Sequence, residues 1–375
     1  MDGTWNDPVS VRQIVQKETS MTVQTPKDAT TGEAVGAATA GDPTVSVIVI
    51  SYNTRDMTVA CLRSVFEETD SPAEVVVVDN ASTDGSVEAI RKEFPADAYP
   101  SLKLVAEETN HGFARAHDVA VPHATAPWLL LLNPDTVVLD HAIDRLLEGA
   151  EATPDAGIWG GRTLFADRSL NPTSAWAGVS LWSTACTVTG VSSVFRDSAL
   201  FNPEGYGGWD RGTPREVDIV TGCFFLIRRA DWDRLGGFDP DFVMYGEEAD
   251  LCHRARKLGF RPRIVPEATI VHYGGASETV RADKLIRVIR AKVELAQRHI
   301  PAAKRKAAIA MLVRWPWSRW RAWQALARMG REGAAEKAAT WGEVWARRDE
   351  WRHGVRSKGA EATAVAGVGA PRKAA

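Results

Sequence analysis

The chain has 375 residues, of which 45% are hydrophobic and 25% are charged, proportions typical of a soluble globular protein. Its net charge of −3 gives no global indication of nucleic-acid binding, and no segment approaches the run of about 18 apolar residues that spans a membrane. The N-terminus lacks the apolar core of a signal peptide, and the four cysteines are far apart, as expected of reduced thiols. These features predict a cytoplasmic protein of one large domain or two ordinary ones.

Strand and helix patterns alternate through the first half of the chain. Residues 1–43 lack periodicity and are predicted to be disordered, apart from a possible short helix near 9–18. The next 110 residues predict an α/β fold with a mostly parallel sheet, flanked by helices and joined by right-handed crossovers. The expected strands are 45–52, 75–79, 102–105 and 128–132, and the expected helices are 56–69, 85–94, 112–121 and 140–152.

The second half is less regular. Residues 155–220 are rich in Gly, Trp, Ser and Pro, and are predicted to form an irregular insertion of short strands. The pattern then predicts a strand within 217–227 interrupted by Gly222, a helix over 248–258 and an amphipathic helix over 279–300. Residues 301–353 are predicted to be helical, with Pro316 breaking any single long helix, and the tail from about 355 to be disordered.

Polar residues follow each predicted parallel strand. They are Ser51, Tyr52 and Asn53 after the first strand, Asp79, Asn80 and Asp84 after the second, and Asn110 and Arg115 after the third. Because open α/β sheets bind ligands at the carboxyl ends of their strands, these clusters favour a nucleotide site over ordinary capped turns. Arg115 could meet a phosphate or equally a surface acid. No GxGxxG or GxxxxGK[ST] motif is present, which disfavours dehydrogenases and P-loop enzymes.

The fourth predicted strand ends in a candidate metal ligand. The run Leu129–Leu132 is followed by Asn133-Pro134-Asp135, and the proline must end the strand because it cannot donate to the sheet. Asp135 alone could be only a turn residue. A carboxylate at this edge also suits a divalent cation that binds substrate phosphates, and His272 could complete the metal shell. Such a lone histidine is more often structural.

A group of acids precedes the helix at 248–258. The three acids are Glu247, Glu248 and Asp250. Acids at the start of a helix complement its dipole, and this effect is enough to explain the presence of one or two of them. Tyr245 and Gly246 directly precede the two glutamates and predict a loop there, from which Glu247 and Glu248 would project. A carboxylate in a cleft can take a proton from an attacking hydroxyl, so these two glutamates are candidate general bases.

Taken together, the ordered motifs resemble the inverting, metal-dependent family 2 glycosyltransferases of the GT-A fold, and within them the bacterial rhamnosyltransferase-like group. The resemblance covers about 60% of the chain and implies a catalytic domain at 44–278. The residue pattern and composition after it predict a helical, basic, Trp-rich region at 279–354 and a disordered tail at 355–375. The resemblance is carried by the segments 45–53, 79–86, 110–116, 132–135, 235–239, 245–252 and 272–277.

The resemblance also implies roles for the matched residues. Asp79 would bind a uracil- or thymine-type base, with Tyr52 and Asn53 lining the nucleotide pocket. Asp135 matches the last acid of the family's Asp-x-Asp motif, whose first position is here Asn133, and His272 supports a Mg²⁺ or Mn²⁺ ion or the diphosphate. Glu248 stands where the family usually has an aspartate base, so Glu247 remains a contender. Gly222 and Asp250 are expected near the diphosphate and sugar.

The implied activity is transfer of a sugar from a nucleoside-diphosphate sugar, such as dTDP-rhamnose or a UDP-sugar, to a glycan or polyprenyl-linked acceptor in cell-surface polysaccharide synthesis. A catalytically inactive nucleotide-sugar-binding scaffold is the alternative, and a nucleotidyltransferase has less support. Residues 301–353 hold seven tryptophans among many arginines. This composition suits either peripheral binding to an anionic membrane surface or a helix docked on the catalytic domain.

Overall fold

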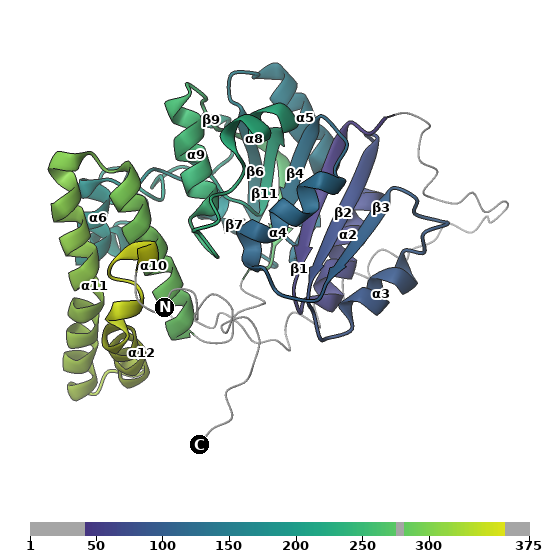
Figure 1. The fold of residues 1–375 in the computed structure, drawn as a ribbon. Coiled ribbons are helices and arrows are strands. Elements are labelled where there is room, and N and C mark those ends of the chain that lie inside the picture. Colours follow the sequence, from purple (N-terminus) through teal and green to yellow (C-terminus); the bar gives the residue numbers. More distant parts are fainter. Residues whose placement is uncertain (1–41, 275–280, 357–375) are drawn as a thin grey trace.

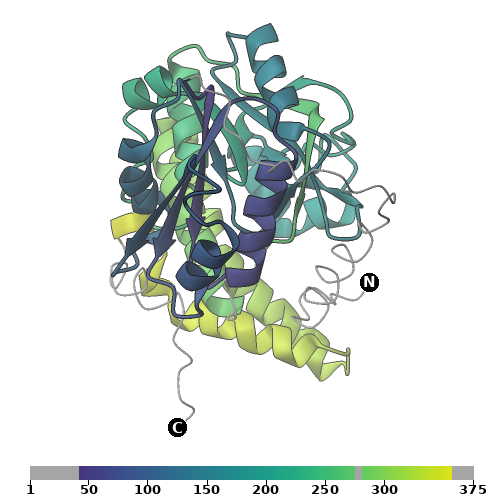
Figure 2. The same cartoon turned by 90° about the vertical axis from the view of Figure 1, so that its right-hand side faces the viewer.

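The computed structural model describes residues 42–274 and 281–356 (Figure 1). The predictions for residues 1–41, including the helix near 9–18, and for the tail from 357 lie outside the described residues. A mixed sheet has helices on both of its faces, and a separate group of helices lies to one side, on the left of Figure 1. Figure 2 shows the same arrangement from a view turned by 90°.

The main sheet has the strand order β3-β2-β1-β4-β11-β6-β12-β5, with β7 beside β6 and β9 beside β12. Strands β3, β2, β1 and β4 are parallel to their neighbours, whereas β11 is antiparallel to both β4 and β6. The strands are β1 (Val45–Ser51), β2 (Ala73–Asn80), β3 (Leu102–Glu107), β4 (Trp128–Leu132), β5 (Thr136–Val138), β6 (Ile158–Leu164), β7 (Leu170–Asn171), β8 (Ala175–Trp176), β9 (Arg215–Glu216), β10 (Ile219–Val220), β11 (Phe224–Arg228) and β12 (Arg263–His272).

The helices connect these strands and then form the C-terminal region. They are α2 (Arg55–Glu67), α3 (Ser86–Glu93), α4 (Gly112–Ala120), α5 (Ala142–Ala152), α6 (Leu181–Thr189), α7 (Val191–Val194), α8 (Arg229–Leu235), α9 (Glu247–Lys257), α10 (Arg281–His299), α11 (Ala302–Arg328) and α12 (Ala334–Ala346). Short 3₁₀ turns occupy Val121–His123, Pro172–Ser174, Arg348–Glu350 and Gly354–Arg356.

The sheet is buried on both faces, which explains its continuous apolar strands. Along β1, Val47 and Val49 contribute to one core with helices α2, α3 and α5, while Ile48 and Ile50 contribute to the opposite core with α4, α8 and α9. Successive side chains of a strand point to opposite faces, so a strand covered on both sides must be apolar at every position. The predicted α/β architecture is therefore confirmed.

Residues 155–220 contain a central strand that the sequence did not reveal. β6 lies between β11 and β12, and its Gly160 and Gly161 make the run look like a turn. A Cβ atom on Gly160 would lie 2.3 Å from Val220 Cγ1, and one on Gly161 would lie 2.1 Å from the Ala268 carbonyl oxygen. The two glycines are thus required by close packing inside the sheet, and the predicted irregular insertion of short strands did not identify this 7-residue strand of the main sheet.

The prediction that Pro316 breaks the C-terminal helix is wrong. α11 continues through Pro316 for 27 residues. Proline costs a helix one backbone hydrogen bond and adds a clash, but packing on neighbouring elements can hold both halves in line. Here Pro316 is buried, and α11 packs against α6, α10 and α12.

The C-terminal helices have an apolar core of their own. It is built from α10, α11 and α12, and includes the fully buried Trp351. The Trp315 and Trp341 rings contact each other at a tilt of 55° with their centroids 5.5 Å apart, so much of the tryptophan-rich segment is used for packing between helices. None of the described helices has the length and apolar character required to cross a bilayer.

Candidate active site

The carboxyl ends of the parallel strands bring the predicted polar clusters to one edge. Ser51 at the end of β1 is paired in register with Asp79 on β2, and Val49 is paired with Leu132 at the end of β4. β11 is antiparallel to β4 and begins at this edge, since Phe224 pairs with Leu132. The segment before β11 therefore reaches the same place as the loops that follow the parallel strands.

Asp79 lies at the centre of the first two loops. Its side chain is buried, and its Oδ1 accepts a hydrogen bond of 2.9 Å from the Ser82 backbone N–H. Its Oδ2 is buried and has no hydrogen-bond partner among the described residues. Such an unsatisfied carboxylate oxygen is costly unless a ligand supplies the donor. An N–H group of a nucleobase is a donor of that kind.

Asn53 joins the β1 and β2 loops. Its backbone N–H donates to Ser82 Oγ at 2.9 Å, and its Oδ1 accepts from the Thr83 N–H at 2.8 Å. Its φ of 51° is left-handed, a conformation that asparagine tolerates better than most residues. Tyr52 precedes it and is half-buried. Asn53 thus fixes the shape of the loop that holds Asp79.

Asn80 and Asn110 connect the β2 and β3 loops. Asn80 Nδ2 donates to Asn110 Oδ1 at 2.9 Å, and Asn80 Oδ1 accepts from the His111 N–H at the same distance. Asp84 accepts from the Arg55 N–H at 2.9 Å. Arg115 is exposed on α4. Burial raises the pKa of the Asp118 carboxyl, and the positive charge of Arg115 opposes that rise. These contacts give Asn80, Asn110 and Asp84 roles in holding the loops together.

Gly112 brings the β3 loop against the segment that precedes the acidic group. Its φ is +76°, and the Phe113 N–H donates to the Val243 carbonyl at 3.1 Å. A Cβ on Gly112 would lie 2.9 Å from Val243 Cγ1 and 3.0 Å from Val243 O. Only glycine allows this approach, which positions the chain just before Glu247.

Gly112→Ala is expected to destabilise the fold by about 2–3 kcal/mol, because the added methyl group meets both a left-handed backbone and the Val243 carbonyl. Urea unfolding measures the change. Gly236→Ala is the matched control, because Gly236 has a φ of +77° and nothing within 4 Å of its Cβ position. The control should lose only about 1 kcal/mol. Equal losses of unfolding free energy in the two variants would show that contact with Val243 does not explain the effect of Gly112→Ala.

Asp135 and His272 come together as the sequence predicted. His272 lies at the end of β12 in register with Thr136, and its Nε2 is 3.4 Å from Asp135 Oδ1. Burial favours the neutral carboxyl, but the nearby His272 outweighs it and brings the pKa of Asp135 below its usual value. Burial likewise opposes protonation of His272, while Cys223 and Asp135 beside it raise its pKa well above the usual value.

Asn133 completes this group. Its Nδ2 is 3.5 Å from His272 Nε2, and its Oδ1 is buried with no hydrogen-bond partner among the described residues. A carboxylate, an imidazole nitrogen and an amide oxygen form a donor set that suits Mn²⁺ or Mg²⁺. The residues present at this edge therefore fit a divalent cation.

Gly222 and Cys223 link the metal-binding candidates to the acids. The Cys223 carbonyl accepts from the Asn133 N–H at 3.1 Å. A Cβ on Gly222 would lie 3.7 Å from Glu248 Cβ and 3.8 Å from a ring carbon of Phe113. Asn133, Gly222 and Glu248 are thus successive neighbours in space. The sequence drew attention to all three, but only the fold shows that they are adjacent.

Glu247 and Glu248 are close enough to influence each other's ionisation. Burial and the charge of Glu248 raise the pKa of Glu247 well above its usual value, and burial also raises the pKa of Glu248. One oxygen of each side chain, Oε2, is buried without a hydrogen-bond partner in the described part of the chain. Glu247 is the more deeply buried, so Glu248 is the carboxyl that ionises first.

Asp250 has different neighbours. Its carboxylate pairs with Arg254 on the same helix at 2.7 Å and with His299 of α10 at 2.9 Å. Arg298 of α10 also pairs with Asp239 and Asp241, in the segment that leads to Glu247. The sequence gave no signal for Arg298 because these contacts span more than 50 residues. Asp250 and Arg298 therefore hold α9 and its loop against α10.

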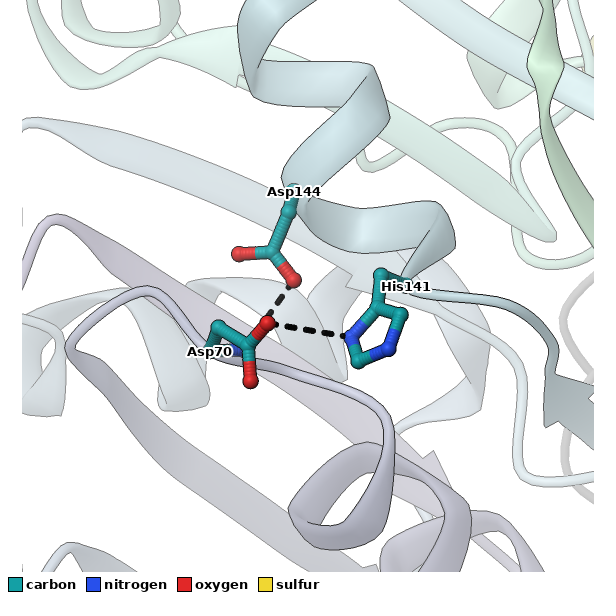
Figure 3. A group of neighbouring side chains, drawn as sticks. All are labelled: Asp70, His141 and Asp144. Carbon is teal, nitrogen blue, oxygen red and sulfur yellow. Dashed lines mark hydrogen bonds and ion pairs between the residues drawn. The ribbon is translucent and has the colours of Figure 1, made fainter.

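Another group of possible metal ligands, Asp70, His141 and Asp144, lies outside this edge (Figure 3). The two Asp144 oxygens accept from the backbone N–H groups of Asp70 and Ser71 at 3.0 and 2.8 Å, and His141 Nδ1 is 3.2 Å from Asp70 Oδ2. Asp70 and His141 are exposed, and Asp70 precedes β2 rather than following it. These contacts tie α5 to the loop after α2.

The sequence model described as Glycosyl transferase family 2 matches residues 46–236, which is half of the chain and includes the loops of β1, β2, β3 and β4. The chain belongs to glycosyltransferase family 2. It is 26% identical over 245 residues to an N-acetylglucosaminyl-diphospho-decaprenol L-rhamnosyltransferase of Mycobacterium tuberculosis, covering 60% of this chain and 75% of that relative. It is 42% identical over 57 residues to Rhamnosyltransferase WbbL of Escherichia coli, covering 15% of this chain and 22% of that protein.

A solved structure has a similar fold. The mannosyltransferase PcManGT from Pyrobaculum calidifontis, in complex with GDP-Man and Mn²⁺, aligns with a TM-score of 0.50 and 21% identity over 95% of each chain. The glycosyltransferase therefore has the expected GT-A architecture, followed by C-terminal helices. The predicted relationship to rhamnosyltransferases is confirmed.

Proposed function

We propose that this family 2 enzyme transfers a sugar from a dTDP- or UDP-sugar, with dTDP-rhamnose as the first candidate, to a lipid-linked or glycan acceptor, with inversion at the anomeric carbon. The observation that carries the proposal is a set of buried, unpartnered oxygens at one sheet edge within the described residues: Asp79 Oδ2, Asn133 Oδ1, Glu247 Oε2 and Glu248 Oε2. Native proteins leave few buried oxygens unsatisfied, so a gathering of them indicates a place where ligands bind. The name of the mycobacterial relative supports a lipid-linked acceptor sugar and a rhamnose donor.

The residues have distinct roles in this mechanism. Asp79 accepts an N–H of the base through Oδ2, and the loop held by Asn53 and Ser82 keeps that oxygen in place. Asp135, His272 and Asn133 would hold a Mg²⁺ or Mn²⁺ ion, whose positive charge would balance the negative charge that develops on the leaving diphosphate. Glu248 takes the proton from the acceptor hydroxyl, whose oxygen attacks the anomeric carbon from the face opposite the diphosphate. Burial and the charge of Glu248 raise the pKa of Glu247, which favours its protonated form beside the base.

Calorimetric titration with UDP, dTDP, GDP and CMP, each with and without Mn²⁺ or Mg²⁺, tests the donor site. We expect cation-dependent binding of UDP or dTDP and weaker binding of GDP and CMP. Asp79→Asn should lower affinity for the preferred nucleotide at least about tenfold, because the charged acceptor of a buried hydrogen bond is lost. Asp56→Asn is the control, since Asp56 is exposed on α2. Absence of binding to all four nucleotides by folded protein would refute the proposal.

A further inference from the structure

Exposed apolar side chains gather at one place beside the C-terminal helices. Among the described residues, seven large hydrophobic side chains are exposed, and four of these lie between residues 182 and 200. The four are Trp182 (50% exposed), Val194 (74%), Phe195 (51%) and Leu200 (60%), and we refer to them as the apolar knob. Soluble proteins rarely expose a cluster of large apolar side chains unless it contacts something.

The knob is held in a defined shape. Trp182 Nε1 donates to the Leu200 carbonyl at 2.7 Å, and the Phe195 and Phe201 rings lie 5.2 Å apart. α6, which carries Trp182, begins with a capping box formed by Ser180 and Ser183. Because these contacts fix the segment, its apolar side chains are exposed in the folded state rather than by fraying.

The knob is attached to a strongly basic region. α6 packs against α11, and an Arg319 guanidinium N–H donates to the Thr187 carbonyl at 3.2 Å. α11 has seven Lys and Arg residues and no acid along its 27 residues. Residues 281–356 together hold 19 Lys and Arg against 7 Asp and Glu, a net charge of +12 in a chain whose total is −3.

Charge also decides which partner fits best. Exposed cations on α11 include Arg314, Arg321 and Arg328, and Trp317 on the same face of the helix is 46% exposed. Tryptophan and arginine are favoured at the interface of a bilayer, and each basic residue near an anionic leaflet contributes about 1 kcal/mol. A neutral protein partner would use the apolar knob but would gain nothing from a charge of +12.

We infer that the helical region docks on an anionic lipid bilayer, with the apolar knob entering the interface and the exposed cations of α11 drawing the protein to the surface. The apolar contact therefore comes mainly from residues 182–200, before the tryptophan-rich segment, because most tryptophans of that segment pack between helices. This inference stands on exposure and charge, and its test does not depend on sugar transfer.

Flotation of the full chain with vesicles tests the inference. We expect binding to phosphatidylglycerol vesicles, at least tenfold weaker binding to phosphatidylcholine vesicles, and loss of affinity as salt is raised. Phe195→Asp/Leu200→Asp should reduce binding at least tenfold. Leu258→Asp is the matched control, because Leu258 is 47% exposed at the end of α9 and lies outside the knob.

A second variant tests the electrostatic part. Arg314→Gln/Arg321→Gln should weaken vesicle binding on the order of 30-fold, and Arg91→Gln/Lys92→Gln, with the same change of charge on exposed α3 residues, should leave it unchanged. Thermal unfolding and nucleotide binding show whether each variant is folded. Equal binding of wild type, Phe195→Asp/Leu200→Asp and Arg314→Gln/Arg321→Gln would overturn the inference. Concentration-dependent self-association that the knob variant loses, without vesicle binding, would instead make the knob an interface between copies.

Discussion

Asp135→Ala is expected to reduce sugar transfer by at least about 1,000-fold, the largest loss we predict for the cation group. Asp135 is the carboxylate of the set formed with His272 and Asn133, and groups that balance charge developing on a phosphate oxygen contribute several kcal/mol to the transition state. Steady-state transfer from dTDP-rhamnose or a UDP-sugar in saturating Mn²⁺ measures the effect. Calorimetry should show in parallel that nucleotide binding no longer depends on the cation.

Asp70→Ala provides the control for Asp135. Asp70 belongs to the other group of possible metal ligands, is exposed, and precedes β2 rather than following a parallel strand. Its removal should leave transfer within about twofold of wild type, as is usual for surface substitutions. If Asp135→Ala retains near-normal, cation-dependent turnover, Asp135 does not hold the ion. A comparable loss in Asp70→Ala would move the metal site to that second group.

The parallel half of the fold could be predicted from the sequence because each strand is buried on both faces. Runs such as Val45–Ser51 and Trp128–Leu132 are apolar at successive positions, and the turn residues after them mark the strand ends. β6 escaped prediction because Gly160 and Gly161 meet other strands at close range, a fact that no local pattern contains. The predicted helix break at Pro316 was wrong for a similar reason, because packing on neighbouring helices keeps α11 continuous through the proline.

The candidate site likewise contains residues that could be predicted from the sequence and contacts that could not. Asp79, Asp135 and His272 were predictable because topology alone carries the ends of parallel strands, and the residues just beyond them, to one edge. The close approach of Gly112 to Val243 and the ion pair of Arg298 with Asp239 could not be predicted, because each joins segments that are far apart in the chain. Such contacts decide where Glu247 and Glu248 sit, and the sequence left open which of the two acts as the base.

Glu248→Gln is expected to lower kcat by about 10² to 10⁴-fold while changing nucleotide affinity no more than about threefold. Glutamine keeps the size and polarity of the side chain but cannot accept a proton from the acceptor hydroxyl. Because burial raises the pKa of Glu248, kcat/KM of the wild type should rise with pH through a midpoint above the usual glutamate value of about 4.3. Single-turnover rates and a pH profile measure both effects.

Glu247→Gln is the matched variant that distinguishes the two acids. Burial and the Glu248 charge raise the pKa of Glu247 and so favour its neutral form, which a neutral amide resembles in charge. Turnover should fall less than about tenfold. A buried carboxyl whose pKa is raised on folding loses stability as pH rises above its unfolded value, so this substitution should also make the protein more stable at pH 7. If instead Glu247→Gln abolishes turnover and Glu248→Gln retains it, the base is Glu247 and Glu248 tunes its pKa.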